Sequence, residues 1–281
     1  MGHHVVSRRG LFLGLGILLL AATTAFAQAQ TGTKEFAPYE GQPGKDVVWV
    51  PTGGTLVDKM LDMAKVTPQD YVIDLGSGDG RLVIAAARRG ARALGIEYNP
   101  EMVELSKRNA AKAGVVDRTE FVKADIFESD FSQASVITLF LLPDLNLKLR
   151  PQLLKLKPGT RVVSNTFTMA EWTPDATETV TGDCCVYCTA LFWIVPAQVD
   201  GEWKLPGGQL VLTQTFQMIS GTLLVDNKTV RIDGGRLSGD RITFTAGDVE
   251  YTGLVRGNEM RGEAKSARGT SSWSAIRAAS K

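Results

Sequence analysis

Three glycines at alternate positions constrain the fold of this chain more than any other feature. They lie in the segment Asp74-Leu75-Gly76-Ser77-Gly78-Asp79-Gly80, between an apolar run at 71–75 that predicts a buried strand and a run at 81–89 that predicts a helix. Glycine permits a sharp turn between such elements, and its missing side chain lets a ligand approach the backbone closely. The segment therefore predicts a strand, a turn and a helix with a nucleotide-like ligand at the turn.

Predicted helices and strands alternate through the part of the chain that contains this turn. Apolar residues at helical spacing predict helices, and short apolar runs bounded by turn residues predict strands. The helices are expected at 55–64, 81–89, 100–113 and 145–156, and the strands at 71–75, 91–97, 119–123, 135–142 and 161–165. This alternation implies an α/β domain over 46–200 with a Rossmann-like, doubly wound parallel sheet.

From Gly201 onward the pattern changes to closely spaced turn signals. Stretches of alternating polarity, such as 229–232, 241–245 and 249–254, lie between these turns. The pattern predicts a small all-β meander domain over 201–281 that closes into a barrel or a sandwich. Binding of a lipophilic ligand, binding of a protein and a structural cap on the preceding domain all remain open for it.

The first 27 residues have the form of an export signal. Arg8 and Arg9 precede an apolar run at 11–22, and Ala25-Phe26-Ala27 has the small-x-small form of a cleavage site. The two arginines fit a twin-arginine signal and a Sec signal equally. We expect an exported, periplasmic or envelope-associated protein with a linker at 28–45. The alternative is an uncleaved N-terminus that anchors the protein to the inner membrane.

Histidine and charge exclude several classes of function. The sequence holds two histidines, His3 and His4, and both precede the expected cleavage site. The mature protein then has none, which excludes a Ser-His-Asp triad, an imidazole general base and a His-ligated metal centre. With 31 basic and 30 acidic residues, no global field indicates a nucleic-acid partner. We expect no metal and no nucleic acid, and the sequence does not indicate an oligomeric state.

Three cysteines, Cys184, Cys185 and Cys188, lie in a run that is expected to form a strand. Alternation along a strand sends positions 185 and 188 to opposite faces, which disfavours both a disulfide and a shared metal ion. We therefore expect small buried hydrophobic residues at these positions.

The glycine-rich turn resembles motif I of class I S-adenosylmethionine-dependent methyltransferases. A dinucleotide fingerprint would need glycine at position 81, where the chain has Arg81. The resemblance implies that the turn passes under the methionine and ribose portions of S-adenosylmethionine, and that 183–196 supplies an antiparallel last strand. Glu97 closes the second predicted strand, where an acidic side chain accepts hydrogen bonds from ribose hydroxyls. Asp125 matches the family's acidic residue near the adenine amino group. Taken alone, Glu97 also fits a solvated strand end and Asp125 an ordinary turn residue.

A narrower resemblance covers about residues 47 to 175. The segments 49–52, 74–81, 97–100, 140–143 and 171–174 look like the small protein-lysine methyltransferase family that includes the enzyme acting on the c-subunit of ATP synthase. This resemblance implies a lysine amine as methyl acceptor. It places the cofactor site at Pro51, Thr52, Asp74, Gly76, Ser77, Gly78, Asp79, Gly80, Glu97, Asn99 and Asp125.

The resemblance places the acceptor near Phe140 to Asp144, at the exit of the fourth strand, and we expect Pro143 and Asp144 to contact it. Capping of the following helix is the alternative for Asp144, and Trp172 fits either a pocket wall or a core aromatic. In-line transfer to a neutral amine depends mainly on alignment and desolvation, so it needs no histidine. Small molecules are the alternative acceptors. An envelope protein that binds an adenosyl group without turnover, with the β domain as its working part, is the alternative to an enzyme.

Overall fold

The computed structural model describes residues 1–2, 35–182 and 186–279. Residues from Phe36 onward form one compact unit, separate from Met1–Glu35. The expected export signal therefore lies almost wholly outside the described residues, as do Cys184 and Cys185. Among the described residues, no helix combines the length and apolarity that a membrane span requires.

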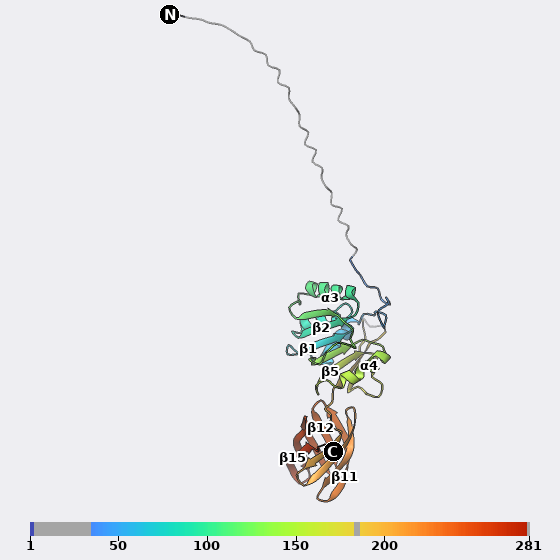
Figure 1. Ribbon diagram of the computed structural model, residues 1–281, viewed down its shortest axis with the longest axis vertical. Coiled ribbons are helices and arrows are strands. Elements are labelled where there is room, and N and C mark those ends of the chain that lie inside the picture. Colours follow the sequence, from blue (N-terminus) through green and yellow to red (C-terminus); the bar gives the residue numbers. More distant parts are fainter. Residues whose placement is uncertain (3–34, 183–185, 280–281) are drawn as a thin grey trace. The chain divides into compact units, whose positions relative to one another are not determined.

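The first part of this unit is a sheet with helices packed beside it (Figure 1). The sheet has seven strands in the order β3-β2-β1-β4-β5-β7-β6. The first five strands are parallel, β7 is antiparallel to β5, and β6 is antiparallel to β7. Their bounds are β1 Tyr71–Leu75, β2 Arg92–Glu97, β3 Thr119–Lys123, β4 Val136–Leu139, β5 Arg161–Asn165, β6 Ala176–Thr179 and β7 Thr189–Ile194. The strand order reverses between β1 and β4, which is the switch point where doubly wound sheets bind ligands beyond the carboxyl ends of their strands. This architecture confirms the predicted Rossmann-like sheet.

Four helices cover the sheet: α1 Gly54–Met63, α2 Arg81–Arg88, α3 Pro100–Ala113 and α4 Pro143–Leu153. The sequence determines the ends of α3 clearly. The Asn99 side chain accepts a hydrogen bond from the Glu101 N–H, Pro100 occupies the first turn, and Gly114 ends the helix in a left-handed conformation.

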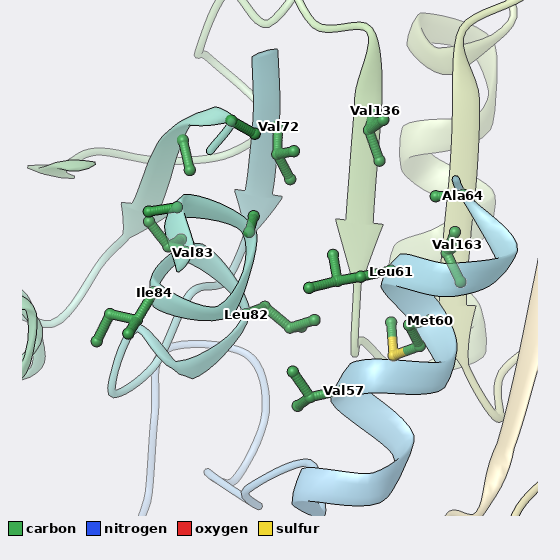
Figure 2. Packing of buried hydrophobic residues seen from close by; sticks show 14 of the residues in the cluster. Val57, Met60, Leu61, Ala64, Val72, Leu82, Val83, Ile84, Val136 and Val163 are labelled. Carbon is green, nitrogen blue, oxygen red and sulfur yellow. The ribbon is translucent and has the colours of Figure 1, made fainter. Parts of the chain in front are cut away.

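Apolar side chains fix α1 and α2 on one face of the sheet. Figure 2 shows Val57, Met60 and Leu61 of α1 and Leu82 and Val83 of α2 gathered against strand valines. These strand residues are Val72 of β1, Val136 of β4 and Val163 of β5, all fully buried. The opposite face packs Ile73 and Ile137 against Leu149 and Leu153 of α4. Because both faces are covered, the central strands are apolar on both sides, as parallel sheets require.

The C-terminal part is a closed antiparallel barrel of eight strands, which selects the barrel from the two predicted alternatives. Each strand pairs with the next, and β15 pairs with β8 to close the ring. The strands are β8 Gly201–Leu205, β9 Gly208–Thr215, β10 Met218–Val225, β11 Lys228–Ser238, β12 Arg241–Ala246, β13 Val249–Arg256, β14 Glu259–Ser266 and β15 Gly269–Arg277. A separate apolar core that includes Trp203, Phe244 and Met260 fills the barrel.

The barrel contacts the segment that follows the parallel strands. Arg236 of β11 forms an ion pair with Asp175, and Gln217 Nε2 donates to the Thr173 carbonyl at 2.7 Å. The Phe216 ring stacks on Trp172 with a centroid separation of 6.2 Å. These contacts combine charge, a hydrogen bond and ring stacking at one junction between the two cores.

Candidate active site

The glycine-rich turn connects β1 to α2 and adopts backbone conformations that favour glycine. Gly76, Gly78 and Gly80 have φ angles of 84°, 54° and 82°. The N–H groups of Gly76 and Ser77 both donate to the Ile96 carbonyl, which ties the turn to β2. A Cβ atom at position 78 would lie 2.7 Å from Trp49 Nε1, so only glycine fits beneath that indole. The turn is therefore held rigidly in place by its neighbours.

Glu97, at the carboxyl end of β2, orients the same turn. Its Oε2 accepts a hydrogen bond from the Gly78 N–H and its Oε1 accepts one from the Asn99 N–H, both at 2.9 Å. A carboxylate has about four lone-pair sites, so further donors can bind to Glu97. Its position and remaining acceptor capacity suit a pair of ribose hydroxyls.

A cavity with an empty volume of about 1010 Å³ lies beyond the carboxyl ends of β1 to β4. Ten of the eleven predicted cofactor residues line it: Pro51, Thr52, Asp74, Gly76, Ser77, Gly78, Asp79, Glu97, Asn99 and Asp125. Gly80 is not among the lining residues. It precedes α2, and a Cβ there would lie 2.8 Å from the Phe121 ring, so packing explains this glycine.

Sequence reasoning missed one wall of the cavity, the segment 42–49. Its backbone forms a small hairpin in which the Trp49 N–H donates to the Gln42 carbonyl at 2.9 Å. Lys45 at its tip pairs with Asp125, and Gln42 is buried. Part of the expected linker at 28–45 thus lines the cavity. Its polar, glycine-containing composition is typical of a linker, and its partner Asp125 is too distant in sequence to indicate otherwise.

Several charged side chains of the cavity form ion pairs with one another. The Lys45 ammonium holds the pKa of Asp125 below its usual range, and the Phe127 N–H, which donates to this carboxylate, adds to the effect. Arg81 donates to both oxygens of Asp79, at 2.9 and 2.6 Å, and also to the Thr52 carbonyl at 2.5 Å. Asp79 and Arg81 therefore link the turn to the segment before α1.

Asp74 is the last polar residue of β1 and is almost completely buried. Burial raises the pKa of its carboxyl to about 7. Thr138 Oγ1 donates a hydrogen bond of 2.6 Å to Oδ1, which opposes the shift, whereas the charges of Glu97 and Asp79 add to it. Near neutral pH, the neutral and charged forms of this carboxyl therefore coexist at the floor of the cavity.

The residues expected at the acceptor side occupy different environments. Pro143 and Asp144 form the first turn of α4, are exposed, and are not among the lining residues of the cavity. Trp172 is fully buried, and its carbonyl accepts a hydrogen bond from Trp193 Nε1. Of the two interpretations of Trp172, the structure selects the core aromatic.

Cys188 is disulfide-bonded, so the expectation of no disulfide was wrong for this residue. The expectation assumed a continuous strand from 183, whereas β7 begins at Thr189 and Cys188 lies before it. Strand alternation therefore does not apply to Cys188.

Replacing Asp74 by Asn removes a carboxyl with a raised folded-state pKa. Between about pH 4 and pH 7, the folded protein keeps a proton that the unfolded chain has lost, so the free energy of unfolding falls as pH rises, by up to about 1.4 kcal/mol per pH unit. Asp74→Asn should lack this loss, and its stability relative to wild type should rise across that range and then level off. Urea unfolding at several pH values measures the free energy of unfolding of both proteins. Replacement of the exposed Asp117 by Asn is the control. If the free energy of unfolding depended on pH in the same way for wild type and Asp74→Asn, the raised pKa of Asp74 would be contradicted.

Comparison with known proteins agrees with this geometry. Residues 74–176 match the family model of the ANTKMT methyltransferase domain. A protein-lysine N-methyltransferase of Saccharolobus islandicus is 47% identical over 131 residues, which cover 46% of this chain and 81% of that protein. The lysine N-methyltransferase that is named for the c-subunit of ATP synthase in Mus musculus is 41% identical over 130 residues, 46% of this chain, and the chain spans about half of its length (52%).

One solved structure that matches this fold contains bound S-adenosyl-L-homocysteine. An RNA methyltransferase from Salinibacter ruber in complex with S-adenosyl-L-homocysteine is 49% identical, with a TM-score of 0.50, and the match covers 53% of this chain and 96% of that chain. The glycine turn and Glu97 both line the cavity at the carboxyl ends of the strands, where an adenosyl group would fit. The chain is a class I S-adenosylmethionine-dependent methyltransferase and belongs to the family defined by the ANTKMT methyltransferase domain.

Proposed function

We propose that this protein transfers a methyl group from S-adenosylmethionine to the ε-amine of a protein lysine. Its relatives carry the names of both lysine and RNA methyltransferases, so relatives alone do not decide between the acceptors. The deciding observation is the distribution of positively charged side chains beside the cavity. No Lys or Arg occurs between Val162 and Trp203, the segment that borders the cavity through Asn165, whose Nδ2 donates to Thr52 Oγ1. The cations of the cavity itself, Lys45 and Arg81, are paired with Asp125 and Asp79. RNA binding depends on free cations for the phosphates, whereas an amine acceptor does not.

The residues of the cavity suit transfer by alignment and desolvation. When bound, S-adenosylmethionine supplies a sulfonium methyl group that a nucleophile can displace in line. Glu97 and the turn at 76–80 would hold its ribose and methionine portions. Trp49, Met102 and Leu141 add apolar surface to the same cavity, and an environment poor in water favours the neutral, nucleophilic form of an incoming amine.

Glu97→Gln tests the cofactor site. An amide offers one acceptor oxygen, so one of the two backbone N–H groups at Gly78 and Asn99 loses its partner, and hydroxyl binding weakens as well. Each lost charge-assisted hydrogen bond is worth about 1.5–3 kcal/mol, so we expect the Kd for S-adenosylhomocysteine to rise by about ten- to a hundredfold in calorimetric titration. Glu101→Gln, on the exposed first turn of α3, should bind like wild type. Equal affinity for the Glu97 variant would remove Glu97 from the cofactor site.

The acceptor class is tested with radiolabelled S-adenosylmethionine. We expect the purified enzyme to label envelope proteins from cells that express it, with the methyl group on lysine by mass spectrometry, and Glu97→Gln to label them weakly. Total RNA and a small-molecule extract are the parallel acceptors. Label in either, with none in protein, would overturn the lysine proposal. Tight binding of S-adenosylhomocysteine without any label would favour an adenosyl-binding protein without turnover.

We also infer that the protein acts outside the cytosol. Arg8 and Arg9 before the apolar run, together with Ala25-Phe26-Ala27, support export. The disulfide of Cys188 supports it independently, because disulfides persist in oxidising compartments. S-adenosylmethionine is made in the cytosol, so the twin-arginine route, which exports folded proteins, would allow the cofactor to be carried along.

Fractionation of cells that express the full chain tests this inference. We expect the protein in the envelope fraction, with an N-terminus at Gln28 by mass spectrometry. Retention of the Arg8→Lys, Arg9→Lys double variant in the cytosol would indicate the twin-arginine route, and unchanged export the Sec route. A full-length cytosolic wild-type protein would contradict export, and a full-length protein in the membrane fraction would indicate an anchor.

A further inference from the structure

We propose that Phe140, Phe167 and Tyr187 form the subsite that receives the lysine side chain. This inference rests on the proposed lysine acceptor and names the residues that recognise it. The sequence placed the acceptor near Phe140 but did not indicate Phe167 or Tyr187. The three rings are spread over 48 positions, and only the fold brings them together.

The three rings contact one another as a triangle. The Phe140 ring is 6.0 Å from Phe167 and 5.3 Å from Tyr187, and Phe167 is 5.6 Å from Tyr187, measured between centroids. Tyr187 is 37% exposed and the other two rings are partly exposed. An aromatic cluster buried for stability would be closed to solvent, whereas this one presents apolar surface to it.

The cluster lies beside the cofactor cavity because of the strand order. Phe140 directly follows β4, Phe167 follows β5, and Tyr187 precedes β7, whose start is aligned with the end of β5 by the pairing of Asn165 with Ala190. All three residues therefore lie at the same edge of the sheet. Phe140 also lines the cofactor cavity, so it connects the cavity to the other two rings.

Two residues at this cluster have backbone conformations that are unusual for side-chain-bearing residues. Thr166, next to Phe167, has a φ of 60°, and Tyr187 itself has a φ of 59°. Such a conformation is a genuine outlier for a β-branched residue such as threonine. Outliers of this kind are energetically unfavourable and concentrate at functional sites. At Thr166 the conformation is held by the Thr189 carbonyl, which accepts from the Thr166 N–H at 2.6 Å, and by Asn165 Oδ1, which accepts from the threonine hydroxyl.

The cluster suits both ends of a lysine side chain. Aromatic surface packs against the four methylenes and removes water from the amine, which favours loss of its proton to solvent. The amine lone pair then forms the N–C bond while the C–S bond breaks and its electron pair stays on sulfur. Positive charge thus moves from sulfur to nitrogen, where the aromatic faces stabilise it. No acidic or basic side chain is needed for this step.

The neighbours of the rings favour an amine over a nucleotide base. A stacked base is accompanied by phosphates, which require Lys or Arg nearby. The residues flanking the rings in sequence are Leu139, Leu141, Thr166, Thr168, Val186 and Cys188, none of which is cationic.

Acceptor kinetics of ring variants test the subsite, with a synthetic peptide that contains one lysine as the probe and the disulfide intact. Tyr187→Ala and Phe167→Ala should each raise the KM for the peptide by about tenfold, or about 1.4 kcal/mol, because each variant loses an aromatic contact to the desolvated amine. Tyr187→Phe keeps the ring and should behave like wild type, as should the neighbouring Val186→Ala. All four variants should keep the wild-type Kd for S-adenosylhomocysteine, which also demonstrates folding.

Binding without turnover supplies a second readout. The lysine peptide should bind wild type loaded with S-adenosylhomocysteine more tightly than a norleucine analogue, and Tyr187→Ala should lose this preference. Three results would overturn the subsite and leave the methylation of lysine standing. They are an unchanged KM in both alanine variants, equal binding of the norleucine peptide, and displacement of the lysine peptide by a single-stranded oligonucleotide. Absence of lysine methylation by a wild type that binds S-adenosylhomocysteine would instead overturn the proposed function, and the subsite with it.

Discussion

The pairing of the glycine turn with the end of β2 is the contact on which the site depends. Gly76 and Ser77 donate to the Ile96 carbonyl, and Gly78 donates to the Glu97 carboxylate, so three consecutive N–H groups are fixed at one strand end. The turn can take this position because β1 and β2 are adjacent parallel strands whose carboxyl ends coincide. The shape of the cavity follows from this contact, since the glycine turn, the Glu97 carboxylate and the start of α2 are all positioned there.

Local sequence signals predicted the elements of this contact well. The period of the apolar residues indicated the strands and helices, and Asn99, Pro100 and Gly114 predicted the ends of α3. Ten of the eleven predicted cofactor residues line the cavity because motif residues lie at strand ends, and the doubly wound topology brings strand ends together. Gly80 differs, because its missing Cβ leaves room for the Phe121 ring rather than for a ligand.

Features that depend on distant partners were not visible in the sequence. The hairpin at 42–49 is fixed by Asp125, and the aromatic cluster joins residues from three separate loops. The disulfide of Cys188 was missed because the predicted strand began at 183, whereas β7 begins at Thr189. A barrel and a sandwich share the same alternation of polar and apolar residues, so only the pairing of β15 with β8 distinguishes them.

Closure of the barrel limits the ways in which the C-terminal part can recognise other molecules. Every barrel strand has two hydrogen-bonded neighbours, so no free strand edge remains among the described barrel residues for an extended peptide to join by β-augmentation. The parallel sheet does end in an edge strand, β6, and all four of its residues are exposed. Recognition through backbone pairing is thus confined to the catalytic sheet, and the barrel can contribute only side chains and turns.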